Sequence, residues 1–188
     1  MRALQIAVLI LTLGSTAAAT LGAETPPIPF DDWGACPFEC CTYRAWRASA
    51  AATAYTRRAE SSPVAFSISK GENVRAITGV VVTMRSGIVK PRIAMTLGIP
   101  KTANSPDPVL ALQPGEILYT LHYLGEGYYL FWYKGGIYSD EVPDSSDDGN
   151  FDVVSKPETE WWAKIKNASG HVGWTKMTGN FTNVDACG

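Results

Sequence analysis

The sequence predicts a mostly β protein, and three observations lead to that prediction. Val, Ile and aromatic residues occur in runs, and these residue types favour strands. Short stretches alternate apolar with polar residues, as half-buried strands do. Turns that contain Gly or Pro separate these stretches. The clearest case is the segment 161–174, where Ala163 and Ile165 alternate with Lys164 and Lys166 before a Gly-bearing turn. This segment is therefore predicted to be a hairpin.

The first 23 residues are predicted to be a signal peptide rather than part of the fold. Arg2 gives a short positive region, and Leu4–Leu13 forms an apolar run. Small residues follow, and cleavage fits after Ala19 or after Ala23. The run is shorter than the roughly 20 residues that a membrane-spanning helix needs, although an N-terminal anchor is the alternative interpretation. We expect export, a periplasmic or secreted location, and no membrane span after cleavage.

The cysteines predict two disulfide bonds. The chain has four, Cys36, Cys40, Cys41 and Cys187, and an even count in an exported chain is typical of disulfides. A vicinal Cys40–Cys41 bond would be strained, which disfavours one of the three pairings. Both remaining pairings connect the N-terminal cluster to Cys187, and the sequence does not choose between them.

Two parts of the chain contain the same turn motif. Gly71-Glu72 and Gly115-Glu116 each form a turn that leads into an apolar, strand-like run. Their spacing indicates a weak internal repeat of about forty residues. The segment 44–54 is Ala-rich and is compatible either with one or two helical turns or with a strand.

The two Gly-Glu turns, together with the terminal Gly170-His-Val-Gly173-Trp174, resemble bacterial SH3-like (SH3b) domains. The resemblance covers residues 53–180 and implies two small SH3-like β-barrel units behind a Cys-rich N-terminal extension. On this interpretation residues 24–52 are the extension, and 53–108 form the first unit with a long connection. Residues 109–188 form the second unit, with an acidic insertion at 138–160, and the hairpin 161–174 closes that second barrel.

A Cys–His nucleophile is the first catalytic arrangement to consider, since SH3-like modules often accompany cell-wall peptidases. The candidates are Cys36, Cys40 or Cys41 with His122 or His171. A nucleophilic cysteine must be a thiolate beside a base, whereas these cysteines are even in number and are expected to be paired in disulfides. We therefore predict no catalytic residue, no cofactor and no enzymatic activity.

The acidic stretch 139–152 is the one candidate for a metal site. Asp144, Asp148, Gly149 and Asp152 match part of a calcium-loop pattern. Serine occupies the third position and the position of the bidentate glutamate, so the pattern is not an EF-hand. We predict a solvated insertion and no metal site.

An aromatic face is the predicted ligand-binding site. The alternation that turns Trp161 and Ile165 inward places Trp162 on the side of the lysines. Apolar or aromatic residues occupy every position of the run 128–133, so both faces of this predicted strand are apolar. One face would fill the barrel, and the other is either exposed or covered by the other unit. Exposed aromatics in SH3-like barrels form grooves for extended peptides. The predicted ligand-binding residues are Trp162, Tyr128, Tyr129, Tyr133, Lys164 and Lys166.

These expectations together predict a non-catalytic binding module of the cell envelope. The expected ligand is a peptidoglycan peptide or an envelope protein. A net charge of −2 gives no basic field for a nucleic-acid partner. The alternative function is a periplasmic inhibitor or assembly factor of an envelope enzyme, and a thiol hydrolase ranks third.

Overall fold

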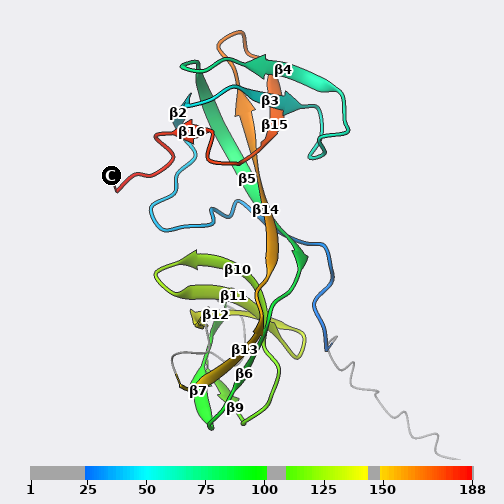
Figure 1. The fold of residues 1–188 in the computed structure, drawn as a ribbon, viewed down its shortest axis with the longest axis vertical. Coiled ribbons are helices and arrows are strands. Elements are labelled where there is room, and N and C mark those ends of the chain that lie inside the picture. The colour runs from blue at the N-terminus through cyan, green and yellow to red at the C-terminus, as the bar shows by residue number, and fades with distance from the viewer. Residues whose placement is uncertain (1–23, 101–108, 144–148, 188) are drawn as a thin grey trace, which may run out of the picture.

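The computed structural model describes residues 24–100, 109–143 and 149–187. The predicted signal peptide and the candidate calcium-loop residues Asp144 and Asp148 lie outside these ranges. The chain forms two lobes stacked along its long axis (Figure 1). We call them the upper lobe (β1–β5 and β14–β16) and the lower lobe (β6–β13).

The described residues contain strands and no helix, which confirms the mostly β prediction. The strands of the upper lobe are β1 (Phe30–Trp33), β2 (Ala45–Ala48), β3 (Ala52–Tyr55), β4 (Val64–Ile68), β5 (Asn73–Arg85), β14 (Glu158–Lys166), β15 (Val172–Lys176) and β16 (Phe181–Thr182). Those of the lower lobe are β6 (Ile88–Pro91), β7 (Met95–Leu97), β8 (Ile99–Pro100), β9 (Leu110–Leu112), β10 (Tyr119–Gly125), β11 (Tyr128–Tyr133), β12 (Gly136–Glu141) and β13 (Phe151–Ser155). The Ala-rich segment 44–54 thus contributes to two strands.

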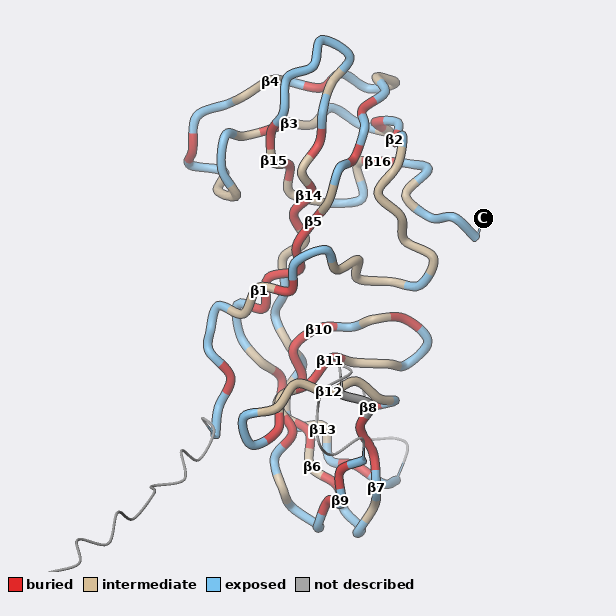
Figure 2. Tube along the Cα trace, turned by 180° about the vertical axis from the view of Figure 1, so that it is seen from behind, coloured by how far each residue is buried: buried red, intermediate tan, exposed pale blue. Residues whose placement is uncertain are grey.

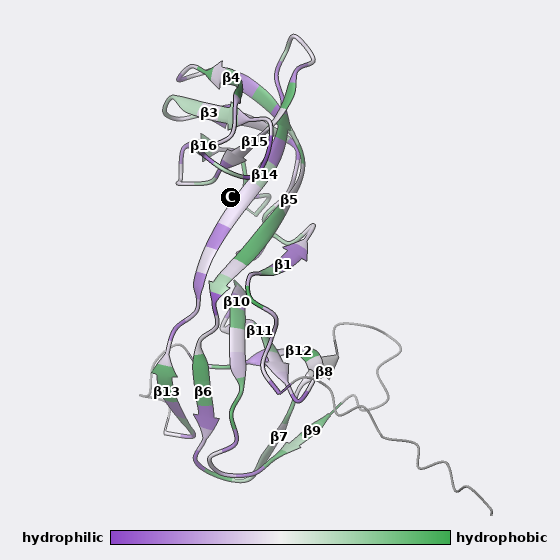
Figure 3. Cartoon of the chain, turned by 90° about the vertical axis from the view of Figure 1, so that its right-hand side faces the viewer, coloured by the Kyte–Doolittle hydropathy of each residue, from purple (hydrophilic) through white to green (hydrophobic). Residues whose placement is uncertain are grey.

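The upper lobe is one curled, half-barrel sheet of eight strands. Its order is β16-β2-β5-β14-β15-β3-β4, and β1 pairs with the lower end of β5. The long antiparallel pair β5–β14 runs from the top of this lobe down to the lower one (Figure 1). A hydrophobic stretch of β5 lies beside β1 in Figure 3. Two strands therefore connect the lobes.

The lower lobe lies between β5 and β14 in the chain. It has a four-stranded sheet of order β10-β11-β12-β8 and the two small pairs β13-β6 and β7-β9. Its core is a separate cluster that includes Leu112, Leu118 and Phe131. The predicted hairpin exists as β14–β15, but its other partners are β5 and β3. The hairpin 161–174 therefore belongs to the sheet of the upper lobe.

The two faces of β14 enter different apolar clusters, as the alternation predicts. Ala163 and Ile165 are fully buried in the main core of the upper lobe, against which Trp161 also packs. Trp162 faces the other side and packs with Val80 and Val82 (Figure 2 shows how burial follows both strands).

A bulge on β5 sets which of its residues face each cluster. The β5–β14 register shifts at Ile77, which has no partner on β14. Before it, Val74 and Ala76 face the main core, whereas after it Val80 and Val82 face the opposite side. One extra residue in a strand moves every later side chain to the other face. A single strand thereby contributes to both clusters.

The two Gly-Glu turns adopt the same local structure. Gly71 and Gly115 have φ values of +86° and +82°, a region that only glycine enters without strain. In each turn the following glutamate, Glu72 or Glu116, accepts a hydrogen bond from the backbone N–H three residues earlier, at 3.0 Å and 2.7 Å. The repeat seen in the sequence is therefore a repeated turn, although the two turns lead into different sheets.

Glu116 should give the protein an acid-sensitive increment of stability. Lys134 donates a hydrogen bond to its carboxylate at 2.8 Å, and the Gln113 backbone and Tyr133 hydroxyl also donate to it. These bonds, Lys134 first, lower the pKa of Glu116 from 4.5 to about 2. A carboxyl whose folded pKa is depressed stabilises the fold above its unfolded pKa and loses that contribution as pH falls through the folded value. The contribution is therefore complete above about pH 4.5 and disappears towards pH 2.

The matching measurement is urea denaturation of the wild type and of Glu116→Gln at several pH values. The variant should lose less stability than the wild type between about pH 4.5 and pH 2. Lys134→Met should reduce the same difference, because it removes the largest cause of the shift. An identical acid dependence in all three proteins would contradict this assignment.

The cysteines form two disulfides, as predicted. The pairs are Cys36–Cys41 and Cys40–Cys187, so the structure selects one of the two pairings left open. The Cys-rich segment lies against the β10–β11 turn of the lower lobe. A side chain at Gly125 would approach the Glu39 backbone nitrogen to 2.7 Å, so glycine is required for this close contact.

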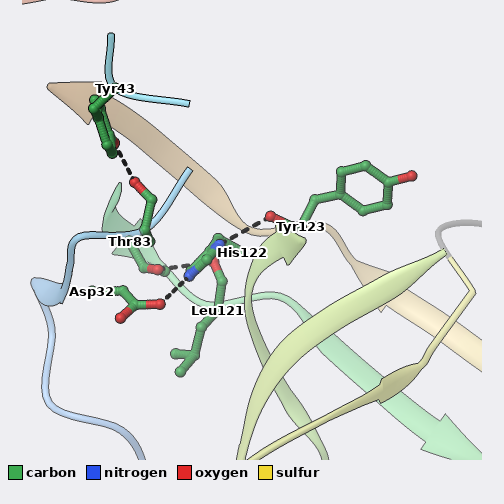
Figure 4. Close-up of polar contacts among 7 residues, drawn as sticks. Asp32, Tyr43, Thr83, Leu121, His122 and Tyr123 are labelled. Carbon is green, nitrogen blue, oxygen red and sulfur yellow. Dashed lines mark hydrogen bonds and ion pairs between the residues drawn. The ribbon is translucent and has the colours of Figure 1, made fainter. Parts of the chain in front are cut away.

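The junction between the lobes contains a buried polar pair. His122 on β10 is 1% exposed, and its Nε2 lies 2.9 Å from a carboxylate oxygen of Asp32 on β1, which is 8% exposed. The His122 Nδ1 donates to the carbonyl of Tyr123 at 3.0 Å. Nearby, the Thr83 hydroxyl on β5 donates to the Leu121 carbonyl at 2.8 Å. Figure 4 shows His122 between its two partners.

Candidate ligand-binding surface

The most exposed aromatic surface is on the upper lobe, on the side of β14 that bears Trp162. We define the tryptophan face as Trp33, Arg58, Lys164 and Trp174. The strand register places the three residues other than Arg58 on this side: Trp33 lies opposite Val80, and Lys164 opposite Trp174. Arg58 reaches it from the loop between β3 and β4.

Trp33 is 59% exposed, yet its ring is held in place. The guanidinium of Arg58 lies 4.6 Å from its ring centroid, and Asp31 accepts two hydrogen bonds from Arg58 at 2.6 Å and 3.2 Å. The ring of Trp174 meets Trp33 edge-on, with centroids 6.0 Å apart. An exposed ring that neighbours already orient loses little freedom when a ligand covers it.

Cations border the two tryptophans. The Lys164 Nζ lies 5.9 Å from the Trp174 ring, and the Arg58 guanidinium 6.0 Å from it. Cations at these distances are attracted to the negative face of an indole. The face therefore offers apolar area together with positive charge.

Trp162 forms the floor beneath this surface. Its indole N–H donates to Glu160 at 3.0 Å, and the ring of Tyr55 lies 6.4 Å away, edge-on. Lys176 also donates to Glu160, at 2.5 Å, and these two bonds, Lys176 first, lower the pKa of Glu160. A hollow of about 300 Å³ lies beside Arg58, Glu160 and Trp162.

A second hollow lies between Trp33 and residues of the lower lobe. It has a volume of about 320 Å³. Its lining residues are Asp32, Trp33, Gly34, Ala35, Cys36, Leu124, Leu130 and Ser139. Residues of both lobes thus meet at Trp33, and pockets between two structural units are common positions for ligand sites.

The predicted exposure of Trp162 is wrong. Its side chain is only 3% exposed, because Val80 and Val82 of β5 and the neighbouring aromatic rings cover it. Tyr133 is buried too, in the core of the lower lobe. Alternation identified the correct face of β14 for Trp162 but not what lies over that face.

The other predicted residues lie in two places. Lys164 is on the tryptophan face, and Lys166 is exposed at the end of β14. Tyr128 and Tyr129 are half-buried on β11 of the lower lobe, in a different sheet. The structure therefore does not bring the predicted tyrosines and lysines together into one face.

Sequence reasoning missed Trp33 and Arg58. Trp33 is in the segment 24–52, which was interpreted only as an N-terminal extension, and Arg58 is in a loop. A signal was present in the four residues of β1, Phe-Asp-Asp-Trp, where Asp31 and Trp33 share one face and Asp32 takes the other. Its pairing with β5, about fifty residues away, gives no local signal.

The residues considered for catalysis have other partners. All four cysteines are in disulfides, so none is a thiol. Both ring nitrogens of His122 are hydrogen-bonded, and His171 is exposed at the β14–β15 turn.

Two acidic residues of the stretch considered for a metal are engaged by other groups. Asp152 pairs with Arg92 at 2.7 Å, and Asp140 accepts from the backbone of Gly98 at 2.6 Å. Cys40, Cys187 and Asp185 form a close group, but the two cysteines are bonded to each other.

Comparison with family models, curated proteins and solved structures found no match to this chain. Among the described residues, no helical segment has the length and apolar character that a membrane crossing requires.

Proposed function

We propose that this protein is a non-catalytic binding module of the cell envelope and that it binds its ligand at the tryptophan face. The ligand class is a peptidoglycan peptide or an envelope protein. The observation that carries the proposal is Trp33, a large apolar side chain that is more than half exposed and already oriented by Arg58 and Trp174. Tryptophan and arginine are enriched among the residues that dominate binding energy.

Two further observations support this function. Two disulfides suit an extracytoplasmic location, which agrees with the signal peptide predicted from residues 1–23. The repeated Gly-Glu turn supports the SH3-like interpretation of the chain, which we retain as part of the proposal. SH3-like modules bind extended peptides through exposed aromatics, the chemistry that the tryptophan face offers.

Trp33→Ala should weaken binding strongly and leave the fold intact. The mature protein would be incubated with purified cell wall and, separately, with solubilised envelope proteins, and the bound fraction measured. We expect a loss of about tenfold or more in affinity for the true ligand, as for a central aromatic residue. The change in unfolding free energy should stay within about 1 kcal/mol, since the side chain is exposed.

Val154→Ala is the matched control, because Val154 is equally exposed but lies on β13 of the lower lobe. It should bind like the wild type. If Trp33→Ala binds both preparations as well as Val154→Ala does, the tryptophan face is not the site. Binding to cell wall rather than to envelope protein, or the reverse, identifies the ligand class.

A further inference from the structure

A large hollow lies on the lower lobe, away from the tryptophan face. It is an open groove of about 890 Å³. We call it the tyrosine groove, and its lining residues are Tyr123, Glu126, Gly127, Tyr129, Glu141, Val142, Pro143, Asn150 and Phe151. Trp33, Arg58 and Trp174 do not line it, so its role can be tested separately from that of the tryptophan face.

Aromatic and apolar groups form the body of the groove. Val142 and Phe151 are buried and provide a rigid floor. The rings of Tyr123 and Tyr129 meet edge-on, with centroids 5.3 Å apart. The Tyr123 hydroxyl accepts a hydrogen bond from the Gly127 backbone at 3.2 Å, which ties this exposed ring to the β10–β11 turn. The aromatic side of the groove, formed by Tyr123 and Tyr129, is therefore already ordered before a ligand binds.

Among the described residues that line the groove, both charged side chains are acidic. Glu126 and Glu141 line it, and both are exposed. Glu39, from the Cys-rich segment, lies beside Glu126, whose negative charge is the largest cause of the raised pKa of Glu39. A ligand with positive charge would relieve this repulsion.

We propose that the tyrosine groove is a binding site for a basic peptide segment, whose lysine or arginine side chain lies against Tyr123 and Tyr129 and pairs with Glu126 and Glu141. Two properties of the groove favour this occupant over an anionic or purely apolar one. Tyrosine faces attract ammonium and guanidinium groups, and carboxylates pair with the same groups. The volume of about 890 Å³, lined by residues of β10, β11 and β12 and the start of β13, suits an extended peptide rather than a single ion.

The direct test is calorimetric titration of the full mature protein with pentalysine at low and at physiological salt. The groove variant is Glu126→Gln with Glu141→Gln. The matched control is Glu24→Gln with Glu60→Gln, which changes the net charge equally but lies outside the groove. We expect the groove variant to bind pentalysine about tenfold more weakly than the control, equivalent to about 1.4 kcal/mol.

Two further titrations separate the groove from general attraction between opposite charges. Pentalysine acetylated on its side chains should bind the wild type far more weakly, because it carries no ammonium groups there. Tyr123→Leu keeps an apolar side chain but removes the aromatic face, and should weaken binding about two- to fivefold. Equal binding by the groove variant and its control, or equal binding of the acetylated peptide, would overturn the proposal. Trp33→Ala should leave pentalysine binding unchanged, so a failure of the function proposed for the tryptophan face is distinguishable from a failure here.

Discussion

Replacing His122 with leucine is expected to lower the free energy of unfolding by about 3–5 kcal/mol, as for the loss of one partner of a buried ion pair. The pair lies at the junction between the lobes, where His122 is 1% exposed and Asp32 is 8% exposed. In the variant Asp32 keeps its buried position but loses the imidazole 2.9 Å away. Chemical denaturation of the variant measures this cost.

The hydrogen bonds of His122 define what is lost. The Tyr123 carbonyl can only accept, so the Nδ1 of His122 carries a hydrogen. The Nε2 faces a carboxylate oxygen, so a second proton must lie between Nε2 and Asp32. The pair is therefore either an imidazolium beside a carboxylate or a neutral pair that shares the same proton. Leucine removes both hydrogen bonds of the ring and leaves the carboxyl group with one partner fewer in a buried place.

Two comparisons isolate this effect. Glu158→Gln breaks the exposed pair Arg85–Glu158 and should change stability little, because solvent screens an exposed pair. The double variant Asp32→Val with His122→Leu removes both buried polar groups and should cost less than the sum of the single changes. If His122→Leu costs no more than Glu158→Gln, the junction does not depend on the buried pair.

Local patterns predicted some strands and turns of this chain, but the predicted acidic insertion 138–160 contains the end of β12, all of β13 and the start of β14. The hairpin β14–β15 and the two Gly-Glu turns lie where alternation and turn residues placed them. The cysteine count predicted two disulfides, and the strain of a vicinal Cys40–Cys41 bond reduced the three possible pairings to two. These properties follow from neighbouring residues or from composition, and both are visible in a single sequence.

Long-range pairing could not be predicted in this way. β14 pairs with β5 although all strands of the lower lobe lie between them in the sequence, and nothing in either strand specifies that partner. The bulge at Ile77 also reverses the parity of β5, so Val80 and Val82 cover Trp162 rather than join the main core. Trp162 was predicted to be exposed because alternation places it on the side of the lysines, and no function was predicted for Trp33, which pairs with Val80. Alternation assigns a face to each residue, but tertiary pairing decides which face is covered.

Removing the Cys40–Cys187 disulfide should destabilise the protein much more than removing Cys36–Cys41. The first bond joins residues 147 positions apart, and the second joins residues 5 apart. In the chain-entropy model a bond that closes the longer loop contributes about 5 kcal/mol and one that closes the shorter loop about 2 kcal/mol. The test compares the double variants Cys40→Ser with Cys187→Ser and Cys36→Ser with Cys41→Ser by chemical denaturation.

The noncovalent contacts of the C-terminal segment should survive the loss of this bond. Ala186 donates a backbone hydrogen bond to Cys40 at 2.8 Å, Thr42 donates to Val184 at 2.9 Å, and the Arg44 guanidinium donates to two further carbonyls of that segment. The folded structure should therefore persist without the bond, and the loss of stability should reflect mainly the greater freedom of the unfolded chain. The single variant Cys187→Ser should, in addition, leave one cysteine, Cys40, reactive towards a thiol reagent. Equal stability of the two double variants would show that loop length does not govern the contribution of these bonds. Labelling of Cys36 or Cys41 in Cys187→Ser would show that the cysteines pair differently.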